Sequence, residues 1–212
     1  AGPVHIHVAE QTAEVDDCLK ATGARPLQWL VDHAGLDARW HLVHATHATA
    51  EEISAVARSG AGVVVCPTTE ANLGDGVFNL PLWQAAGATL SIGSDSHVAR
   101  EWTQELRLLE YSQRLALRRR AVAAAPQAGE PSTAQRLYAA ALAGGAAAAA
   151  QAHWGFTPGA RADLLVLDPT SLPHTGLTPP QWLDALVFAA DRPRWAEVWV
   201  AGTPVHPKPG SH

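Results

Sequence analysis

Short apolar segments alternate with amphipathic stretches along roughly the first 120 residues of the chain. The apolar segments are rich in Val, Ile and Leu, and they predict strands at 4–8, 40–44, 62–66 and 89–93. The stretches between them repeat apolar residues at helical spacing, which predicts helices at 12–22, 26–34, 50–59 and 80–86. Strands that alternate with helices indicate a parallel α/β sheet. Four such units occupy about half of the ~250 residues of an eight-stranded barrel.

Local signals refine the bounds of these elements. Thr49-Ala50-Glu51-Glu52 is a capping box that opens a helix, and Gly60 is placed to end that helix. The residues 67–76 have no apolar periodicity, so we expect a loop there. Because this loop follows a buried strand, it is expected to overhang the end of the sheet where parallel strands finish.

The second half of the chain has a different pattern. Long helices are predicted at 102–119 and 132–152, with Gly144-Gly145 expected to bend or split the second one. Farther along, a strand within 159–168 and a helix at 179–190 are expected, followed by a small hairpin of strands 197–201 and 203–206 around Gly202. These strands predict a small antiparallel β-module, with 207–212 frayed. We therefore expect residues 1–155 to form the barrel portion and residues 156–212 to belong to the module.

Composition narrows the function classes. The chain has 15 basic and 20 acidic residues, for a net charge of −5, so it carries no basic stripe for nucleic acid or for an anionic membrane. Two cysteines, Cys18 and Cys66, stand far apart, which argues against a disulfide framework and favours the cytoplasm. An apolar content of 47% supports a sizeable core, and no uninterrupted apolar run is long enough for a transmembrane helix.

Four polar residues stand at or just beyond the ends of predicted strands. His7 and Glu10 follow the first strand, His44 ends the second, and Asp95 follows the fourth. In a barrel of parallel strands this is where side chains enter the active site. Imidazole and carboxylate groups bind zinc, and a second carboxylate would transfer protons. We interpret His7 and Asp95 as metal ligands and Glu10, His44 and Asp95 as catalytic groups.

Simpler roles are expected for several neighbours. His5 is expected to be a packed residue, or one that supports a ligand, rather than a ligand itself, and a structural role is also expected for His41 and His47. Cys66 is expected to be a small buried hydrophobic residue because no cationic residue flanks it to activate the thiol. The Ser94-Asp95-Ser96 sequence is common in plain turns, so only its combination with the other motifs indicates a site.

In order and context, these motifs resemble the amidohydrolase superfamily and, within it, the cytosine/guanine-type deaminase branch. The segments HVAEQ, LVHATH, CPTTEANLGDG and IGSDSH carry the resemblance, which extends from residue 4 to about residue 206. Related purine deaminases have a CP-x-SN-x-x-LG-x-G loop. The segment Thr68-Thr69-Glu70-Ala71-Asn72 departs from it toward members that act on a formimino group.

The resemblance implies the C-terminal half of a TIM-type (β/α)8 metal-dependent hydrolase barrel, with part of a small β-sandwich module. It implies one zinc ion, or iron, bound by His7 and Asp95. It also implies hydrolysis of formimino-L-glutamate, a small-molecule substrate, in cytoplasmic histidine degradation, by an enzyme that is a homodimer at full length. In such members Asp95 accepts a proton from water, His44 orients the resulting hydroxide, and Glu10 protonates the departing nitrogen.

The resemblance also leaves part of a site unaccounted for. The family's first two ligands come from a His-x-His pair on the first barrel strand. The pair here, His5-Ile6-His7, has the context of the fifth strand instead. We therefore expect a partial chain, with the remaining ligands upstream of Ala1. Two alternatives stay open: a purine or pyrimidine deaminase of the same superfamily, and a metal-free half-barrel that acts in folding or assembly.

Overall fold

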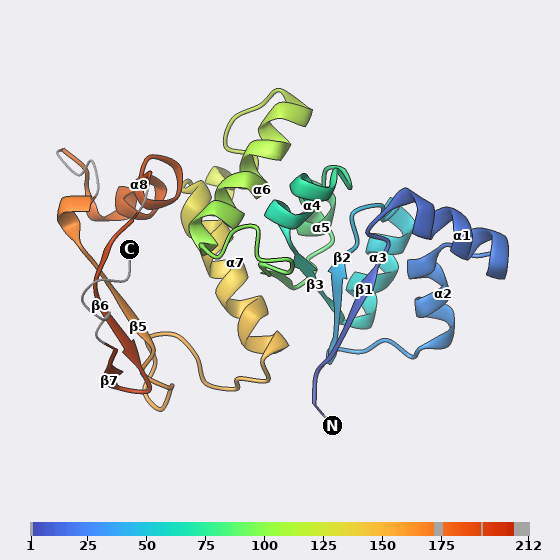
Figure 1. Ribbon diagram of the computed structural model, residues 1–212, viewed down its shortest axis with the longest axis horizontal. Coiled ribbons are helices and arrows are strands. Elements are labelled where there is room, and N and C mark those ends of the chain that lie inside the picture. The colour runs from blue at the N-terminus through green and yellow to red at the C-terminus, as the bar shows by residue number, and fades with distance from the viewer. Residues whose placement is uncertain (1, 172–175, 192, 206–212) are drawn as a thin grey trace. The chain divides into compact units, whose positions relative to one another are not determined.

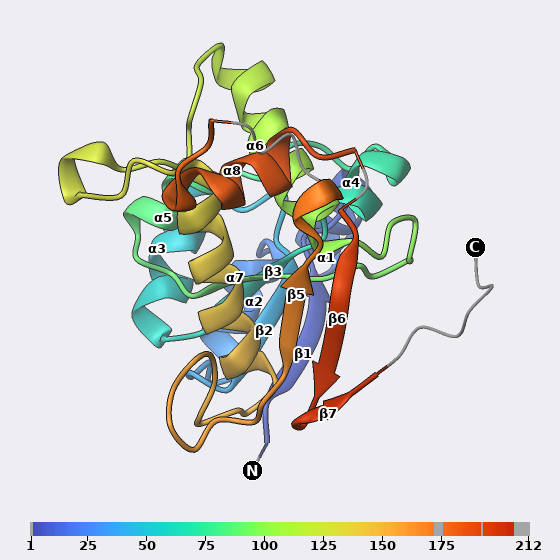
Figure 2. The same ribbon diagram turned by 90° about the vertical axis from the view of Figure 1, so that its left-hand side faces the viewer.

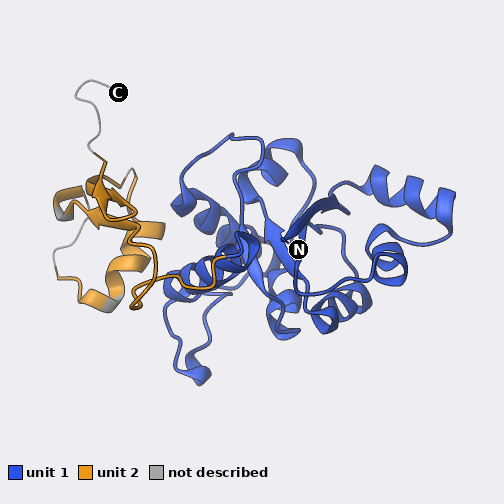
Figure 3. Ribbon diagram, turned by 90° about the horizontal axis from the view of Figure 1, so that it is seen from below, with its two compact units in different colours: residues 1–150 blue, residues 151–212 orange. Residues whose placement is uncertain are grey.

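The computed structural model describes residues 2–171, 176–191 and 193–205. The polypeptide forms two compact units, unit 1 (residues 1–150) and unit 2 (residues 151–212), coloured separately in Figure 3. Within the described parts of the chain, every helix is too short or too polar to cross a bilayer. Division into a barrel portion ending at residue 155 and a module beginning at residue 156 stays a prediction.

Unit 1 is built on a four-stranded parallel sheet, which confirms the α/β class. Its strands are β1 (Val4–Val8), β2 (Trp40–His44), β3 (Gly62–Val65) and β4 (Leu90–Ile92). They are ordered β1-β2-β3-β4, so each strand pairs with its neighbour in the sequence. Figure 1 labels the first three of these strands. The register sets His5 opposite His41 and Val8 opposite His44. The carboxyl ends of the strands therefore finish at one edge of the sheet.

The helices of unit 1 connect and cover these strands. They are α1 (Thr12–Thr22), α2 (Pro26–His33), α3 (Ala50–Ser59), α4 (Pro67–Leu73), α5 (Leu80–Ala85), α6 (Trp102–Leu117) and α7 (Thr133–Ala148), with a 3-10 turn at Pro126–Ala128. Helix α7 packs against β3 and β4, and α6 packs against β4 and α4. The core between sheet and helices includes the fully buried Leu42, Val65, Val56 and Leu106.

The two predicted signals around α3 are confirmed. The side chain of Thr49 accepts a hydrogen bond from the backbone N–H of Glu52, and the Glu52 carboxylate accepts one from the N–H of Thr49. Gly60 ends the helix in the left-handed conformation at φ 84°, which glycine adopts without steric strain. Such a cap contributes about 1 kcal/mol to helix stability, so α3 begins at a defined residue beside the end of β2.

Two predictions about local structure are wrong. Residues 67–73 form helix α4 instead of a loop, with Pro67 in its first turn and Gly74 ending it at φ 76°. Helix α7 runs unbroken through Gly144-Gly145, so the predicted split is wrong, and a bend there stays a prediction. A Cβ atom at Gly144 would lie 2.1 Å from the carbonyl oxygen of Leu90, so glycine allows α7 to approach the backbone of β4.

Unit 2 contains a three-stranded antiparallel sheet, as the sequence predicts. Its strands are β5 (Leu164–Leu167), β6 (Trp195–Val200) and β7 (Thr203–Pro204), ordered β5-β6-β7 and visible together in Figure 2. The predicted hairpin around Gly202 joins β6 and β7; its last predicted residue, His206, and the segment 207–212 lie outside the described residues. The predicted helix at 179–190 is a 3-10 turn (Pro179–Gln181) followed by α8 (Trp182–Phe188), and another 3-10 turn spans Pro169–Ser171.

Candidate metal centre

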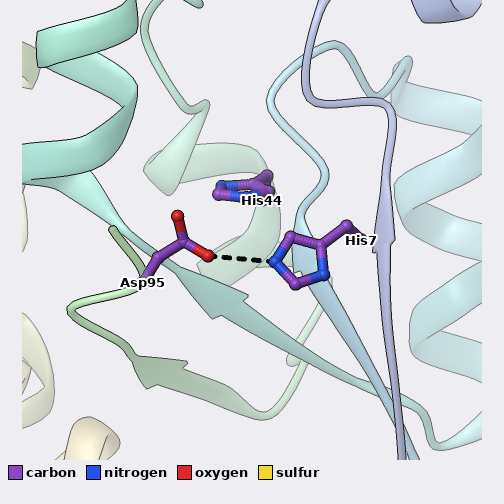
Figure 4. Close-up of side chains that lie close together, drawn as sticks. All are labelled: His7, His44 and Asp95. Atoms are coloured by element: carbon purple, nitrogen blue, oxygen red, sulfur yellow. Dashed lines mark hydrogen bonds and ion pairs between the residues drawn. The ribbon is translucent and has the colours of Figure 1, made fainter. Parts of the chain in front are cut away.

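Three side chains from separate strands meet at the carboxyl edge of the unit 1 sheet. His7 projects from β1, His44 is the last residue of β2, and Asp95 follows β4 (Figure 4). Nε2 of His7 lies 2.9 Å from Oδ1 of Asp95. One possible ligand atom from each of the three residues lies within 4.8 Å of the others. Two imidazoles and a carboxylate at this spacing suit a divalent cation such as zinc.

His44 is completely buried, and its two ring nitrogens have different surroundings. Nδ1 lies 3.2 Å from Oε1 of Glu70, within hydrogen-bond distance. Nε2 lies 3.4 Å from Oε1 of Glu10, and it has no hydrogen-bond partner among the described residues. A buried nitrogen without a partner is costly unless it binds something further. The residues present therefore fit a metal ion or a metal-activated water at Nε2.

The charges of the cluster shift two of its pKa values in opposite directions. The hydrogen bond from His7, assisted by the positive potential of His44, lowers the pKa of Asp95 despite partial desolvation of the carboxyl group. Burial by itself would lower the pKa of His44. The hydrogen bond to Glu70 and the negative charges of Glu10, Glu70 and Asp95 outweigh burial and raise that pKa. Asp95 is thus kept ionised, as a ligand or proton acceptor requires.

Glu10 lies beside this cluster and differs from Asp95 in its electrostatics. Burial raises the pKa of Glu10, and the nearby carboxylates of Asp75 and Asp95 add to the increase. A raised pKa suits a carboxyl group that takes up and releases a proton during a reaction. Its backbone is held by Glu14, whose carboxylate accepts hydrogen bonds from the N–H groups of Ala9 and Glu10.

The backbone near the cluster adopts conformations that are rare for residues other than glycine. Among the described residues these positive φ angles include 69° at His44, 41° at Asp95, 50° at Ala9 and 51° at Ala45. Each follows or ends one of the strands that supply the site. Left-handed backbone costs roughly 1–2 kcal/mol at such residues, so surrounding contacts must hold it in place.

The structure brings all four residues predicted to form the site, namely His7, Glu10, His44 and Asp95, to one region. Their roles as ligands or catalysts stay predictions. The sequence interpretation gave His44 no ligand role, whereas the geometry puts it within reach of the same ion as His7 and Asp95.

Two further residues, Thr69 and Glu70, were missed because their segment was expected to be a loop. Both belong to the first turn of α4 and contact other parts of the site. Pro67 near the start of α4 and Gly74 after it are a recognisable signature of a short helix. That signature is the signal that could have placed these two side chains on a rigid element.

His41 is buried, as expected of a packed residue, whereas His5 is exposed. The ring of His5 stacks on that of His41 at 5.1 Å between centroids. Cys66 is buried, and burial raises the pKa of its thiol far above the ordinary range, so the thiol is not activated.

Comparison with known proteins identifies relatives of the whole described region. The pattern of the Amidohydrolase family matches residues 2–205. Formimidoylglutamate deiminase of Pseudomonas aeruginosa is 48% identical over 94% of this chain, and 5-methylthioadenosine/S-adenosylhomocysteine deaminase of Halobacterium salinarum is 33% identical over 84%. The aligned regions are 44% and 39% of those proteins, so the chain spans less than half the length of each.

Solved structures give the same result for the fold. A crystal structure of an amidohydrolase from Brucella melitensis matches with a TM-score of 0.88 and 46% identity, covering 96% of this chain and 44% of that one. An adenosine deaminase from Xanthomonas campestris, solved with bound zinc, matches with a TM-score of 0.79 and 28% identity, covering 95% and 45% respectively. The four-stranded parallel sheet of unit 1 therefore corresponds to part of a larger TIM-type barrel.

Proposed function

Because the chain belongs to the amidohydrolase family, we propose that it supplies part of the active site of a metal-dependent deiminase. The proposed reaction converts N-formimino-L-glutamate and water into N-formyl-L-glutamate and ammonia. The observation that carries the proposal is the convergence of His7, His44 and Asp95, with the buried Nε2 of His44 left without a hydrogen-bond partner among the described residues. The 48% identity to formimidoylglutamate deiminase supports this substrate.

The proposed metal ligands within this chain are His7 and Asp95, with His44 close enough to contact the same ion or its water. A bound zinc or iron ion would act as a Lewis acid and allow hydroxide to form from water near neutral pH. Catalytic zinc usually has about three protein ligands. We therefore propose that further ligands come from outside the described chain, in keeping with the larger size of its relatives.

Asp95 is the proposed acceptor of the proton that water loses. Its lowered pKa keeps it ionised and ready to accept. His44 is the proposed group that orients the attacking hydroxide, because the lone pair on its Nε2 can accept a hydrogen bond from it. Both roles use side-chain atoms of the cluster formed by His7, His44 and Asp95.

Glu10 is the proposed proton donor to the departing nitrogen. Its raised pKa favours the protonated form more than an exposed glutamate would, and Oε1 of Glu10 lies 3.4 Å from Nε2 of His44. The C–N bond to the terminal nitrogen breaks as that nitrogen gains its protons and leaves as ammonia. The former water oxygen becomes the formyl oxygen, which balances the reaction.

The test is an ammonia-release assay on the full-length protein that contains this chain. The protein is first stripped with a chelator and then given one equivalent of zinc or iron, with N-formimino-L-glutamate as substrate. We expect negligible turnover in the stripped sample and restored turnover after metal addition. Absence of ammonia release from the metal-loaded protein would reject the proposal.

A second candidate is deamination of a purine, because a 5-methylthioadenosine/S-adenosylhomocysteine deaminase and an 8-oxoguanine deaminase are 33% and 35% identical to parts of this chain. The formimino substrate is favoured because Thr69 and Glu70 stand where purine deaminases carry Ser-Asn. The same assay with adenosine derivatives and guanine as substrates separates the two candidates.

The proposed reaction belongs to histidine degradation, and we propose the cytoplasm as its location. The two free thiols of Cys18 and Cys66 suit a reducing compartment. A homodimeric full-length enzyme is part of the same proposal, and gel filtration with light scattering would test it.

A further inference from the structure

The first turn of α4 contacts three other elements through three consecutive residues. Thr68 contacts α6, Thr69 contacts the segment that carries Asp95, and Glu70 contacts His44 at the end of β2. The proposed reaction gives none of these residues a chemical role. Thr69 and Glu70 are nevertheless almost fully buried. Thr69 contacts the residues on either side of Asp95, and Glu70 contacts His44 itself.

Thr69 makes contacts on both sides of Asp95. Its Oγ1 accepts a hydrogen bond from the backbone N–H of Ser96 at 3.2 Å. The same oxygen lies 3.3 Å from the carbonyl oxygen of Ser94 and 3.0 Å from Oγ of Ser96. One hydroxyl group therefore fixes the residues immediately before and after Asp95. This contact explains how Asp95 is kept at φ 41°, where its carboxylate reaches His7.

Glu70 determines which nitrogen of His44 faces the site. Its Oε1 lies 3.2 Å from Nδ1 of His44 and accepts a second hydrogen bond, 2.9 Å long, from the backbone N–H of Cys66. An ionised carboxylate only accepts hydrogen bonds, so Nδ1 must carry the proton. Nε2 of neutral His44 then presents its lone pair to the side of Glu10 and the metal centre.

We propose that Thr69 and Glu70 are positioning residues for the deiminase site: Thr69 sets the backbone that carries Asp95, and Glu70 sets the tautomer and orientation of His44. The proposal rests on the proposed function for its kinetic consequences, but not for its structural ones. Because both residues lie in one short helix, α4 positions Asp95 and His44 relative to each other. Neither residue touches the substrate in this scheme.

The neighbouring Thr68 provides a matched control. Its Oγ1 donates to Oε1 of Glu105 at 2.6 Å, and its backbone N–H donates to Oε2 of Glu105 at 2.9 Å. This pair connects α4 to α6 and contacts none of His7, His44 or Asp95 through a described hydrogen bond. Replacing either Thr68 or Thr69 with Val exchanges one hydroxyl for a methyl group of similar size, and both exchanges fall in the same helical turn.

The test compares Thr69→Val, Thr68→Val and Thr69→Ser in the full-length, metal-loaded protein. We expect Thr69→Val to lower kcat on the order of 10- to 100-fold with little change in KM. Thr69→Ser, which keeps the hydroxyl, should restore most of kcat, and Thr68→Val should stay within about threefold of the parent. Equal losses of kcat in the two Val variants would overturn the role of Thr69.

Hydrogen exchange supplies a readout that needs no activity. The amide of Ser96 donates to Thr69, so the peptide spanning residues 93–98 should exchange faster in Thr69→Val and at the parent rate in Thr68→Val. Unchanged exchange of that peptide in Thr69→Val would contradict the proposed contact. If the parent protein releases no ammonia from formimino-glutamate, the proposed function fails, while this measurement still decides the role of Thr69.

Glu70 is tested by Glu70→Gln and Glu70→Leu. Both contacts of Glu70 use the same oxygen, so a glutamine carbonyl can accept both hydrogen bonds, whereas leucine accepts neither. We expect Gln to keep kcat within about tenfold and Leu to lower it by more than that. In nitrogen NMR spectra of the protein labelled at histidine, the proton on Nδ1 of His44 should persist in Gln and be lost or mixed with the other tautomer in Leu. A persistent Nδ1 proton in the Leu variant would overturn the role of Glu70.

Discussion

Strands β3 and β5 have similar sequences and different surroundings. Each has four residues, Gly-Val-Val-Val in β3 and Leu-Leu-Val-Leu in β5. β3 lies between two parallel neighbours and is almost entirely buried, whereas β5 is an edge strand of an antiparallel sheet with Leu165 and Val166 exposed. A run of aliphatic residues therefore indicates a strand but does not tell how much of it the fold buries.

The difference extends to the residues that follow each strand. Just beyond β3 lie Cys66 and α4, whose first turn contacts His44 of the candidate metal centre. Just beyond β5, Asp168 accepts hydrogen bonds from Thr170, two residues away, which is a local turn contact. Within the described residues, the possible metal ligands gather only in unit 1. A strand buried among parallel neighbours presents its end to a shared site, whereas a solvated edge strand in this chain ends in a local turn.

The largest expected effect compares one aspartate from each unit. Asp95→Ala should lower kcat about a thousandfold in the full-length enzyme, because it removes a proposed ligand and proton acceptor. Asp163→Ala should leave kcat near the parent value. Asp163 pairs with the exposed Arg161 and accepts a hydrogen bond from Ala201, within unit 2. Steady-state ammonia release measures both, and equal losses would contradict the assignment of the chemistry to unit 1.

The next effect tests how tightly unit 1 packs around β4. Gly144→Ala should reduce the free energy of unfolding by about 3 kcal/mol, because the added methyl group meets the backbone of Leu90. Gly145→Ala meets nothing within 4 Å and should stabilise α7 by roughly 0.5–1 kcal/mol. Urea unfolding measures both changes. A Gly144→Ala variant as stable as Gly145→Ala would show that α7 can move away from β4 at little cost.

A matched pair of valines tests the β3 and β5 comparison directly. Val65→Ala should lower the free energy of unfolding by about 2 kcal/mol, because Val65 is fully buried and the truncation leaves a cavity. Val166→Ala should stay within about 0.5 kcal/mol, since 42% of Val166 is already exposed. Hydrogen exchange measured separately for peptides of unit 1 and of unit 2 reports each change in stability in the unit where it occurs. Comparable losses at the two sites would mean that β5 is covered in the full-length protein.

The smallest expected effect is a pH dependence that arises at His41. Burial, aided by the proximity of His5, lowers the pKa of His41 below its ordinary 6.5. Above pH 6.5 His41 is neutral in both folded and unfolded chains. As the pH falls below 6.5 the unfolded chain gains the proton first, so stability falls by up to about 1.4 kcal/mol per unit of pKa difference.

His41→Leu should remove this contribution to the pH dependence. Urea unfolding between pH 7.5 and pH 5 measures it as the difference in slope between parent and variant. Identical slopes would mean that His41 titrates alike in the folded and unfolded chains.

Much of unit 1 is predictable from local signals. The bounds of β1, β2 and α3 follow from apolar spacing, a capping box and a glycine, all of which act within a few residues. The gathering of His7, His44 and Asp95 also follows, because parallel strands finish at one edge. Helix α4 was missed because seven residues are too few for a visible helical period.

The support of the site is less predictable for a physical reason. The contacts of Glu70 with His44 and of Thr69 with Ser96 join residues 26 and 27 positions apart. Such contacts depend on how α4 is directed by the end of β3, which no local pattern specifies. The same holds for Gly144, where only glycine fits because α7 lies against the backbone of Leu90.

The left-handed backbone at Ala45 offers a place to engineer heat resistance. Ala45 is buried at φ 51° and supplies no group to the proposed chemistry. Ala45→Gly would relieve roughly 1–2 kcal/mol of steric strain against about 0.4–1 kcal/mol of added freedom in the unfolded chain. The balance favours glycine, so a single methyl deletion beside His44 should raise the melting temperature of an enzyme prepared for use as a biocatalyst.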